Sequence, residues 1–361
     1  MNNSTKEISS AEKEKINELE QRTILTKFES TVQVLREKYT HSEIADMLGK
    51  SNSNVSSTAS NINNKLRKAE QTLRLIDQIP SLVRSADDPL SDEWLGLDWT
   101  DWVGFKSLLQ LDSNPLPNKP GVYRVRHPAV PGLAYVGNNS RRLGRRVYTL
   151  AKMTHRDTGM ENSPHYRAEP MRKLRQAYDP DEEDQFEVSA ASPSFAVRSY
   201  ISRGIQDALI ASYRRKRGGS PQFNFHDFNG LPIKGPPATR TIKWRQWQAT
   251  RDSDWMGLLW SDPVSFAELN TAEIPEQGIY RVWHPSEADK DNAAQPLDYI
   301  GNSGELPMKL QSRSAQIEDS AVFSTLQLQF GYTIRRELQT DFLGAHYFAH
   351  DTPPHSQYGD R

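Results

Sequence analysis

The fold of this chain is decided by two tripeptides, Gly121-Val122-Tyr123 and Tyr135-Val136-Gly137. Each lies in a short run of strand-favouring residues, 122–126 and 134–137, and prolines and a glycine lie between the runs. Such a pattern favours two strands joined by a turn. We therefore predict an antiparallel hairpin that places Tyr123 and Tyr135 side by side at a sheet surface.

The same pattern occurs a second time, as Gly278-Ile279-Tyr280 and Tyr299-Ile300-Gly301. The preceding segments also match, because Trp94-Leu95-Gly96-Leu97-Asp98-Trp99 is echoed by Trp255-Met256-Gly257-Leu258-Leu259-Trp260. Proline-containing linkers at 80–89 and 230–252 separate the repeated segments from the residues before them. The sequence predicts a helical region at 1–79, a first copy of the repeat at 88–232 (copy one) and a shorter second copy at 252–361 (copy two).

Further residues of copy one follow the hairpin in a fixed order. A Ser-x-x-Leu-x-x-Arg run occupies Ser140, Leu143 and Arg146, a helical run contains Gln206-Asp207-Ala208-Leu209-Ile210, and Pro221-Gln222-Phe223-Asn224 closes the segment. With the two tripeptides, this order resembles the GIY-YIG nuclease superfamily. The resemblance implies an α+β fold in which each unit is a small three-stranded antiparallel sheet flanked by helices. It also implies one divalent metal ion and the hydrolysis of a DNA phosphodiester.

The resemblance assigns roles to four residues. Tyr123 or Tyr135 would accept the proton of the attacking water. Arg146 would stabilise the charge that gathers on the phosphate, a task for which a planar guanidinium is better suited than an ammonium. Asn224 would hold a phosphate or a tyrosine in place. Copy two has Lys309 at the position of Arg146.

The chain departs from the family at the metal-binding glutamate, where copy one has Gln206 and, by sequence alignment, copy two has Thr340. A neutral amide is a poorer ligand for Mg²⁺ or Mn²⁺ than a carboxylate. Asp207 is the neighbouring acid, and it aligns with Asp341, but one residue along a helix is a rotation of about 100°. A metal site in copy one would therefore depend on Gln206 and Asp207, with His226 and Asp227 as further candidate ligands.

Charge is distributed unevenly along a chain that is nearly neutral overall, with 45 Lys and Arg against 46 Asp and Glu. Residues 138–177 hold ten Lys and Arg against three Asp and Glu, whereas residues 301–361 hold five against seven. Local positive charge favours phosphate binding, so copy one is predicted to contact DNA. Its candidate contact residues are Arg141, Arg142, Arg145, His165 and Arg167.

The helical region contains a second candidate DNA-binding element at about 41–68. Ala45 permits close helix crossing, Gly49 favours a turn and Val55 would anchor a second helix, a pattern that resembles the helix-turn-helix of sigma factors and response regulators. The second helix would present short polar side chains and a lysine to DNA, namely Lys50, Ser53, Asn54, Ser57 and Asn61. Apolar residues continue at alternating spacings of four and three over 55–76. This seam predicts either a homodimeric coiled coil or packing against the first helix.

No cysteine and no run of membrane-span length occur in the sequence, and the first residues lack the apolar core of a signal peptide. We expect an intracellular, cytoplasmic protein without a membrane partner. Two functions are open. The leading expectation is a metal-dependent DNA endonuclease targeted by the N-terminal segment. The alternative is a catalytically inactive DNA-binding protein derived from the same fold, since Gln206 replaces the glutamate.

Overall fold

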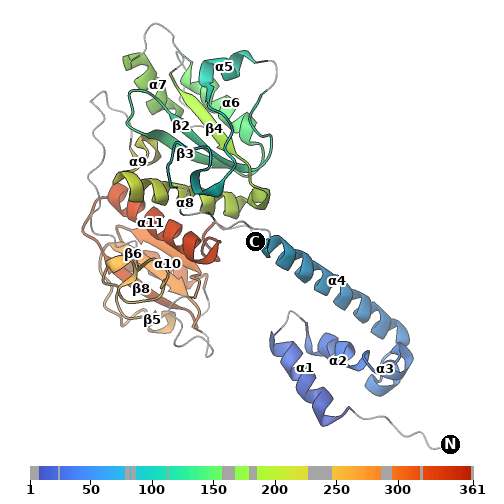
Figure 1. Ribbon diagram of the computed structural model, residues 1–361. Helices are drawn as coiled ribbons and strands as arrows, with labels where there is room; N and C mark the ends of the chain where they lie inside the picture. The colour runs from blue at the N-terminus through green and yellow to red at the C-terminus, as the bar shows by residue number, and fades with distance from the viewer. Residues whose placement is uncertain are drawn as a thin grey trace, which may run out of the picture. The chain divides into compact units, whose positions relative to one another are not determined.

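The computed structural model describes residues 8–22, 25–77, 82, 87–111, 114–156, 167–178, 185–226, 246–285, 295–317 and 320–358. The chain divides into two compact units, Met1–Ile79 and Pro80–Arg361. The described residues of the first unit form four helices, and those of the second form the two copies of the repeat, with a mixed α+β composition (Figure 1).

The N-terminal unit consists of helices capped by their own sequence. Its elements are α1 (Ser10–Arg22), α2 (Lys27–Leu35), α3 (His41–Leu48) and α4 (Asn52–Asp77). Thr40 caps α3 by accepting a hydrogen bond from the Glu43 backbone, and the Glu43 side chain accepts one from the Thr40 backbone. Gly49 ends α3 in the left-handed conformation, at φ 61°, which a glycine adopts without strain. The turn joins two adjacent helices, α3 and α4, within the segment 41–68.

Copy one is built around one antiparallel sheet in the order β1-β4-β2-β3. Its strands are β1 (Val103–Gly104), β2 (Gly121–Arg126), β3 (Leu133–Asn139) and β4 (Glu187–Ala191). Its helices are α5 (Phe105–Gln110), α6 (Leu143–Thr154), α7 (Ala168–Tyr178), α8 (Ser199–Arg217) and α9 (Gln222–Phe225), with short 3-10 turns at Trp94–Gly96 and Ser194–Val197.

Copy two repeats this plan with fewer helices among its described residues. Its sheet has the order β5-β8-β6-β7. The elements are β5 (Val264–Ser265), β6 (Gly278–Trp283), β7 (Tyr299–Ser303), β8 (Val322–Gln327), α10 (Leu306–Ser314), α11 (Tyr332–His350) and 3-10 turns at Trp255–Gly257 and Phe266–Glu268. The expectation of three strands in each sheet is incomplete, because a two-residue edge strand, β1 or β5, adds a fourth.

The predicted tyrosine hairpin is confirmed in both copies. In copy one, Tyr123 pairs with Gly137 across the β2–β3 ladder, and the rings of Tyr123 and Tyr135 lie 5.9 Å apart. In copy two, Tyr280 pairs with Gly301 and the corresponding rings lie 5.8 Å apart. A Cβ atom on Gly137 or Gly301 would collide with the ring of the paired tyrosine. The glycine of the second tripeptide is therefore needed to seat the tyrosine of the first.

In each copy, the repeated tryptophan segment covers a buried arginine of an inner strand, β2 or β6. Arg124 of β2 donates to the carbonyls of Pro89 and Ser91, and its guanidinium lies 4.3 Å from the ring centroid of Trp99. Burial lowers the pKa of Arg124 to about 9. In copy two, Arg281 lies 4.4 Å from Trp260 in the same way. The Trp segments thus cover an arginine whose Nη atoms donate to backbone carbonyls, while its Nε has no hydrogen-bond partner among the described residues.

The two copies pack through their longest helices, α8 and α11, which lie between the two sheets (Figure 1). Both helices have 19 residues, so positions can be matched by counting from their first residues. Ala211 and Gly344 occupy the same position, and a Cβ atom on Gly344 would collide with that of Ala211. The helices therefore cross closely at equivalent residues, and the copies are related by an approximate two-fold axis.

Candidate functional site

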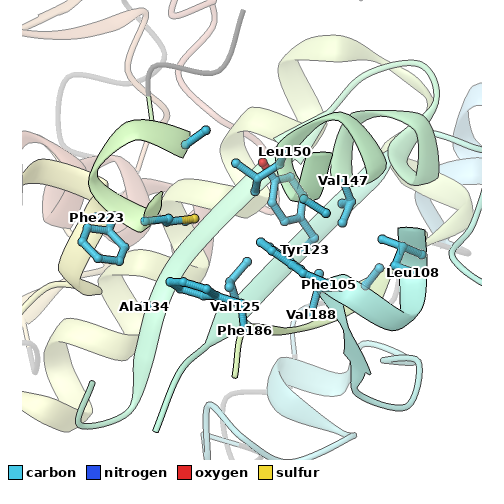
Figure 2. Close-up of a cluster of buried hydrophobic side chains, with 14 of the residues drawn as sticks. Phe105, Leu108, Tyr123, Val125, Ala134, Val147, Leu150, Phe186, Val188 and Phe223 are labelled. Carbon is cyan, nitrogen blue, oxygen red and sulfur yellow. The ribbon is translucent and has the colours of Figure 1, made fainter. Parts of the chain in front are cut away.

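The first tyrosine of the hairpin lies in the hydrophobic core of copy one. Tyr123 is 1% exposed and belongs to a cluster with Phe105, Val147 and Leu150, which Figure 2 shows around its ring. In copy two, burial raises the pKa of the equivalent Tyr280. Tyr135 is half-buried and lines a cavity between the copies. Of the two predicted proton acceptors, Tyr135 is the one that faces open space.

Gln206 is clamped to the edge of the sheet. Its Nε2 donates to the carbonyl of Val136 at 2.9 Å, and its Oε1 accepts a hydrogen bond from Asn138 Nδ2. Both partners lie on β3, at the end of the sheet order. The amide nitrogen is thereby matched to a carbonyl, which a carboxylate at the same position would repel.

Copy two contains the same clamp, which corrects the sequence alignment. Gln339 Nε2 donates to the Ile300 carbonyl at 2.8 Å and its Oε1 accepts from Asn302. Gln206 is the eighth residue of α8 and Gln339 the eighth of α11. The counterpart of Gln206 is therefore Gln339 and not Thr340, and the counterpart of Asp207 is Thr340 and not Asp341. The sequence itself supports this register, because Phe342 and Leu343 follow Gln339 at the spacing at which Leu209 and Ile210 follow Gln206.

Asn224 satisfies the backbone of the same edge strand. Its Oδ1 accepts from the Val136 amide at 2.9 Å and its Nδ2 donates to the Val136 carbonyl at 2.8 Å. In copy two, Gln357 makes the same pair of bonds to Ile300, at 2.9 and 3.0 Å. An edge strand otherwise leaves such groups unpaired. The two amides of Asn224 and Gln357 thus act as substitutes for a neighbouring strand, and Gln357 was not singled out from the sequence.

Asp207 faces the interface between the copies, and not Val136 and Asn138, the hydrogen-bond partners of Gln206. The hydroxyl of Tyr358, from copy two, donates to its Oδ2. Burial raises the pKa of Asp207 to about 8, against the opposing effect of Arg336 and Arg203. A carboxyl whose pKa is raised by burial and whose oxygen is held by a tyrosine hydroxyl is a poor partner for a divalent cation.

The residues at this position do not fit a magnesium or manganese site. The oxygen of Gln206 accepts from Asn138, Asp207 is held by Tyr358, and His226 is 3.1 Å from Glu337 of copy two. Asp227 lies outside the described residues. Within the described part of the chain, no group of three or more His, Asp and Glu residues is placed to hold a metal ion.

A cavity of about 450 Å³ lies between the two copies beside these residues. Its lining comes from both copies: Tyr135, Asn138, Arg203, Gln206, Asp207, Ile210, Asn224 and Phe225 from copy one, and Arg336, Gln339, Thr340, Leu343, Gln357 and Tyr358 from copy two. Gln206 and Gln339 therefore share one space.

The basic surface of copy one is smaller than its sequence suggests and is centred on the start of α6. Arg141, Arg142 and Arg145 are exposed, and Arg146 is half-buried. Arg167 is buried and donates to the carbonyl of Asn224 at 2.8 Å, so it does not belong to the exposed surface. His165 lies outside the described residues.

One residue of the basic run at 214–217, Arg214, joins the copies together. Arg214 is buried and forms ion pairs with Glu337 at 3.0 Å and Asp341 at 2.9 Å, both on α11. Their charges raise the pKa of Arg214 against the effect of burial. On the other side of the axis, the same helical position holds Tyr347, which packs against Gly204. The interface is thus ionic on one side and apolar on the other.

The candidate DNA-reading residues of the N-terminal unit are accessible. Lys50, Ser53, Asn54, Ser57 and Asn61 are all exposed. Lys65 is paired with Glu29 at 2.8 Å. Val55, Ala59 and Ile62 of the predicted seam pack against α2 and α3, which agrees with the intramolecular alternative for this part. The side chains of α4 beyond residue 65 lie outside the described ones. A homodimer formed through that part of the helix therefore stays a prediction.

None of the described helices is both long and apolar enough to cross a membrane. The chain matches no model of a known protein family, and it matches neither a curated protein nor a solved structure.

Proposed function

We propose that this protein is a DNA-binding protein built from two GIY-YIG-like units that have exchanged metal-dependent cleavage for binding. The observation that carries the proposal is the paired glutamine clamp. Gln206 and Gln339 occupy equivalent positions and make the same bonds to the edge strand and to an asparagine. A carboxylate needed for a metal ion is replaced in both copies by an amide whose hydrogen bonds favour the neutral group.

The charge at the start of α6 supports DNA as the partner. Arg142 is the N-terminal cap residue of α6, and Arg141 precedes it. Cations at a helix N-terminus are unfavourable, because the helix dipole is positive there. A bound phosphate backbone would relieve both this effect and the mutual repulsion of the arginines. The accessible polar face of α4, Ser53, Asn54 and Ser57, would add contacts to bases or phosphates.

The proposal is tested by the triple substitution Arg141→Ala, Arg142→Ala, Arg145→Ala in the full chain. Duplex binding, followed by fluorescence anisotropy over a range of salt concentrations, should weaken by at least about tenfold, and the salt slope should fall by about 2–3. The matched control is Arg215→Ala, Lys216→Ala, Arg217→Ala, which removes the same charge from the exposed end of α8. Equal loss in both triple variants would contradict the assigned surface.

The second candidate is a metal-dependent DNA endonuclease of the same fold. It is favoured by the paired rings of Tyr123 and Tyr135 and by Arg146 on the helix that follows them. Its test is Mg²⁺- or Mn²⁺-dependent nicking of supercoiled plasmid by the wild-type chain, with loss of nicking in Arg146→Ala. Such nicking would put this candidate first.

A further inference from the structure

The cavity between the copies carries a charge pattern that neither DNA-binding surface uses. Its lining contains three charged residues, Arg203, Arg336 and Asp207. Arg203 and Arg336 are the fifth residues of α8 and α11, so the approximate two-fold axis relates them. Both are exposed, whereas Asp207 already accepts a hydrogen bond from the Tyr358 hydroxyl. The cavity therefore presents two cations against one carboxyl and favours an anion.

Each arginine is held over an aromatic ring of the other copy. The guanidinium of Arg203 lies 5.7 Å from the ring centroid of Tyr358, and that of Arg336 lies 5.8 Å from Phe225. Tyr358 directly follows Gln357, just as Phe225 directly follows Asn224. Both side chains line the cavity, where the planar guanidinium can donate two hydrogen bonds to phosphate oxygens.

The remaining polar lining consists of side-chain amides. Gln206 and Gln339 each use one N–H and one lone pair in the clamp, and each amide has a second N–H and a second lone pair. The aromatic rings of Tyr135, Phe225 and Tyr358 also line the cavity. Amides and rings together are the groups that hold the edge and face of a nucleobase. The volume of about 450 Å³ lies within the usual range for small-molecule sites.

We propose that this cavity is a composite nucleotide-binding site. Arg203 and Arg336 bind the phosphate, while the amides of Gln206 and Gln339 and the neighbouring rings bind the base. The nucleotide is either a free mononucleotide or a single unit of a DNA strand, since both present the same chemistry. The site requires both copies. Copy two, which lacks the positive charge of copy one, thereby contributes to ligand binding.

The test is isothermal titration calorimetry of the full chain with three probes: deoxynucleoside monophosphates, a single-stranded deoxytetranucleotide and inorganic phosphate. Binding of a nucleotide probe should weaken at least about tenfold in Arg203→Ala, Arg336→Ala. It should stay within about twofold in the control Arg217→Ala, an exposed arginine on the same helix outside the cavity. Because both arginines are exposed, the thermal midpoint of the double variant should equal that of the wild type. Arg203→Lys, Arg336→Lys serves as a second variant that retains the charge.

The three probes separate the outcomes. Monophosphate binding lost in the double variant supports a free nucleotide as the occupant, and tetranucleotide binding alone, lost in the same variant, supports a strand. Absence of nucleotide binding, binding unchanged in the double variant, or phosphate binding as tight as that of any nucleotide overturns the proposal. Duplex binding through the α6 arginines is measured separately, so failure here leaves the proposed function standing.

Discussion

Copies one and two have the same buried design and different surfaces. Each has the tyrosine hairpin, the arginine under tryptophan rings and the glutamine clamp. At the start of the helix after the hairpin, however, Arg142 and Arg145 of α6 are replaced in α10 by Glu305 and the exposed Met308. The shared features thus follow from folding, and the surface that we propose binds DNA occurs in copy one alone. The glutamine clamp is shared and also lines the cavity, so it belongs to a site that the two copies form together.

The largest difference in stability effect is expected between the equivalent interface residues of the two copies, Arg214 and Tyr347. Arg214→Ala leaves Glu337 and Asp341 buried without their cation, and should lower the free energy of unfolding by about 3–5 kcal/mol. At the equivalent position, Tyr347→Phe removes a buried hydroxyl that has no hydrogen-bond partner among the described residues, so stability should change little. Urea unfolding of both variants measures this asymmetry. Similar losses in the two variants would contradict it.

The edge-strand amides should behave alike in both copies. Asn224→Ala removes the acceptor for the Val136 amide, and Gln357→Ala removes that for Ile300. Each should lower stability by about 1–3 kcal/mol, because a buried donor is left unsatisfied. Thermal unfolding measures the effect, and DNA binding serves as the second readout. If Asn224→Ala abolished DNA binding while leaving stability unchanged, Asn224 would be a ligand-binding residue and not a structural one.

Stability should depend on pH through Asp207, which has no acidic counterpart because Thr340 occupies its position in copy two. The pKa of Asp207 is raised to about 8 in the folded chain and is near its ordinary value of about 4 in the unfolded chain. The folded state therefore binds the proton more tightly, and stability falls as pH rises from about 4 to about 8. The slope is at most about 1.4 kcal/mol per pH unit. Asp207→Asn should flatten the pH dependence of the thermal midpoint measured over this range, whereas Thr340→Ala should leave it unchanged. An unaltered slope in Asp207→Asn would refute the assignment.

The smallest change in DNA affinity is expected when the arginines of copy one are introduced at the equivalent positions of copy two. Glu305→Arg, Met308→Arg places arginines on α10 at the positions that Arg142 and Arg145 have on α6. Duplex affinity measured at low salt should increase by about 2- to 10-fold, since a second basic surface is created without a groove shaped for DNA. The neutral pair Glu305→Gln, Met308→Gln is the control. A larger gain in the control would show that the loss of Glu305 dominates.

The sequence predicted the elements that depend on local patterns. The hairpin, the turn at Gly49 and the duplication all follow from short motifs. Contacts between copies could not be predicted, because they depend on how α8 meets α11. Arg167 was predicted to contact DNA, yet it is buried and donates to the carbonyl of Asn224, and Arg214 is buried against Asp341; both partners are distant in sequence. Gln339, in contrast, could have been matched to Gln206 from the sequence, because Phe342 and Leu343 follow it at the spacing of Leu209 and Ile210, and its bond to the edge strand confirms the match.

The central claim is that copy one binds duplex DNA in a chain that does not cleave it. The most direct test incubates the wild-type chain with labelled duplex and supercoiled plasmid in Mg²⁺ and in Mn²⁺, and follows binding and strand integrity in the same samples. The account predicts salt-sensitive binding with intact strands in both metals. Metal-dependent cleavage that is lost in Arg146→Ala would contradict it.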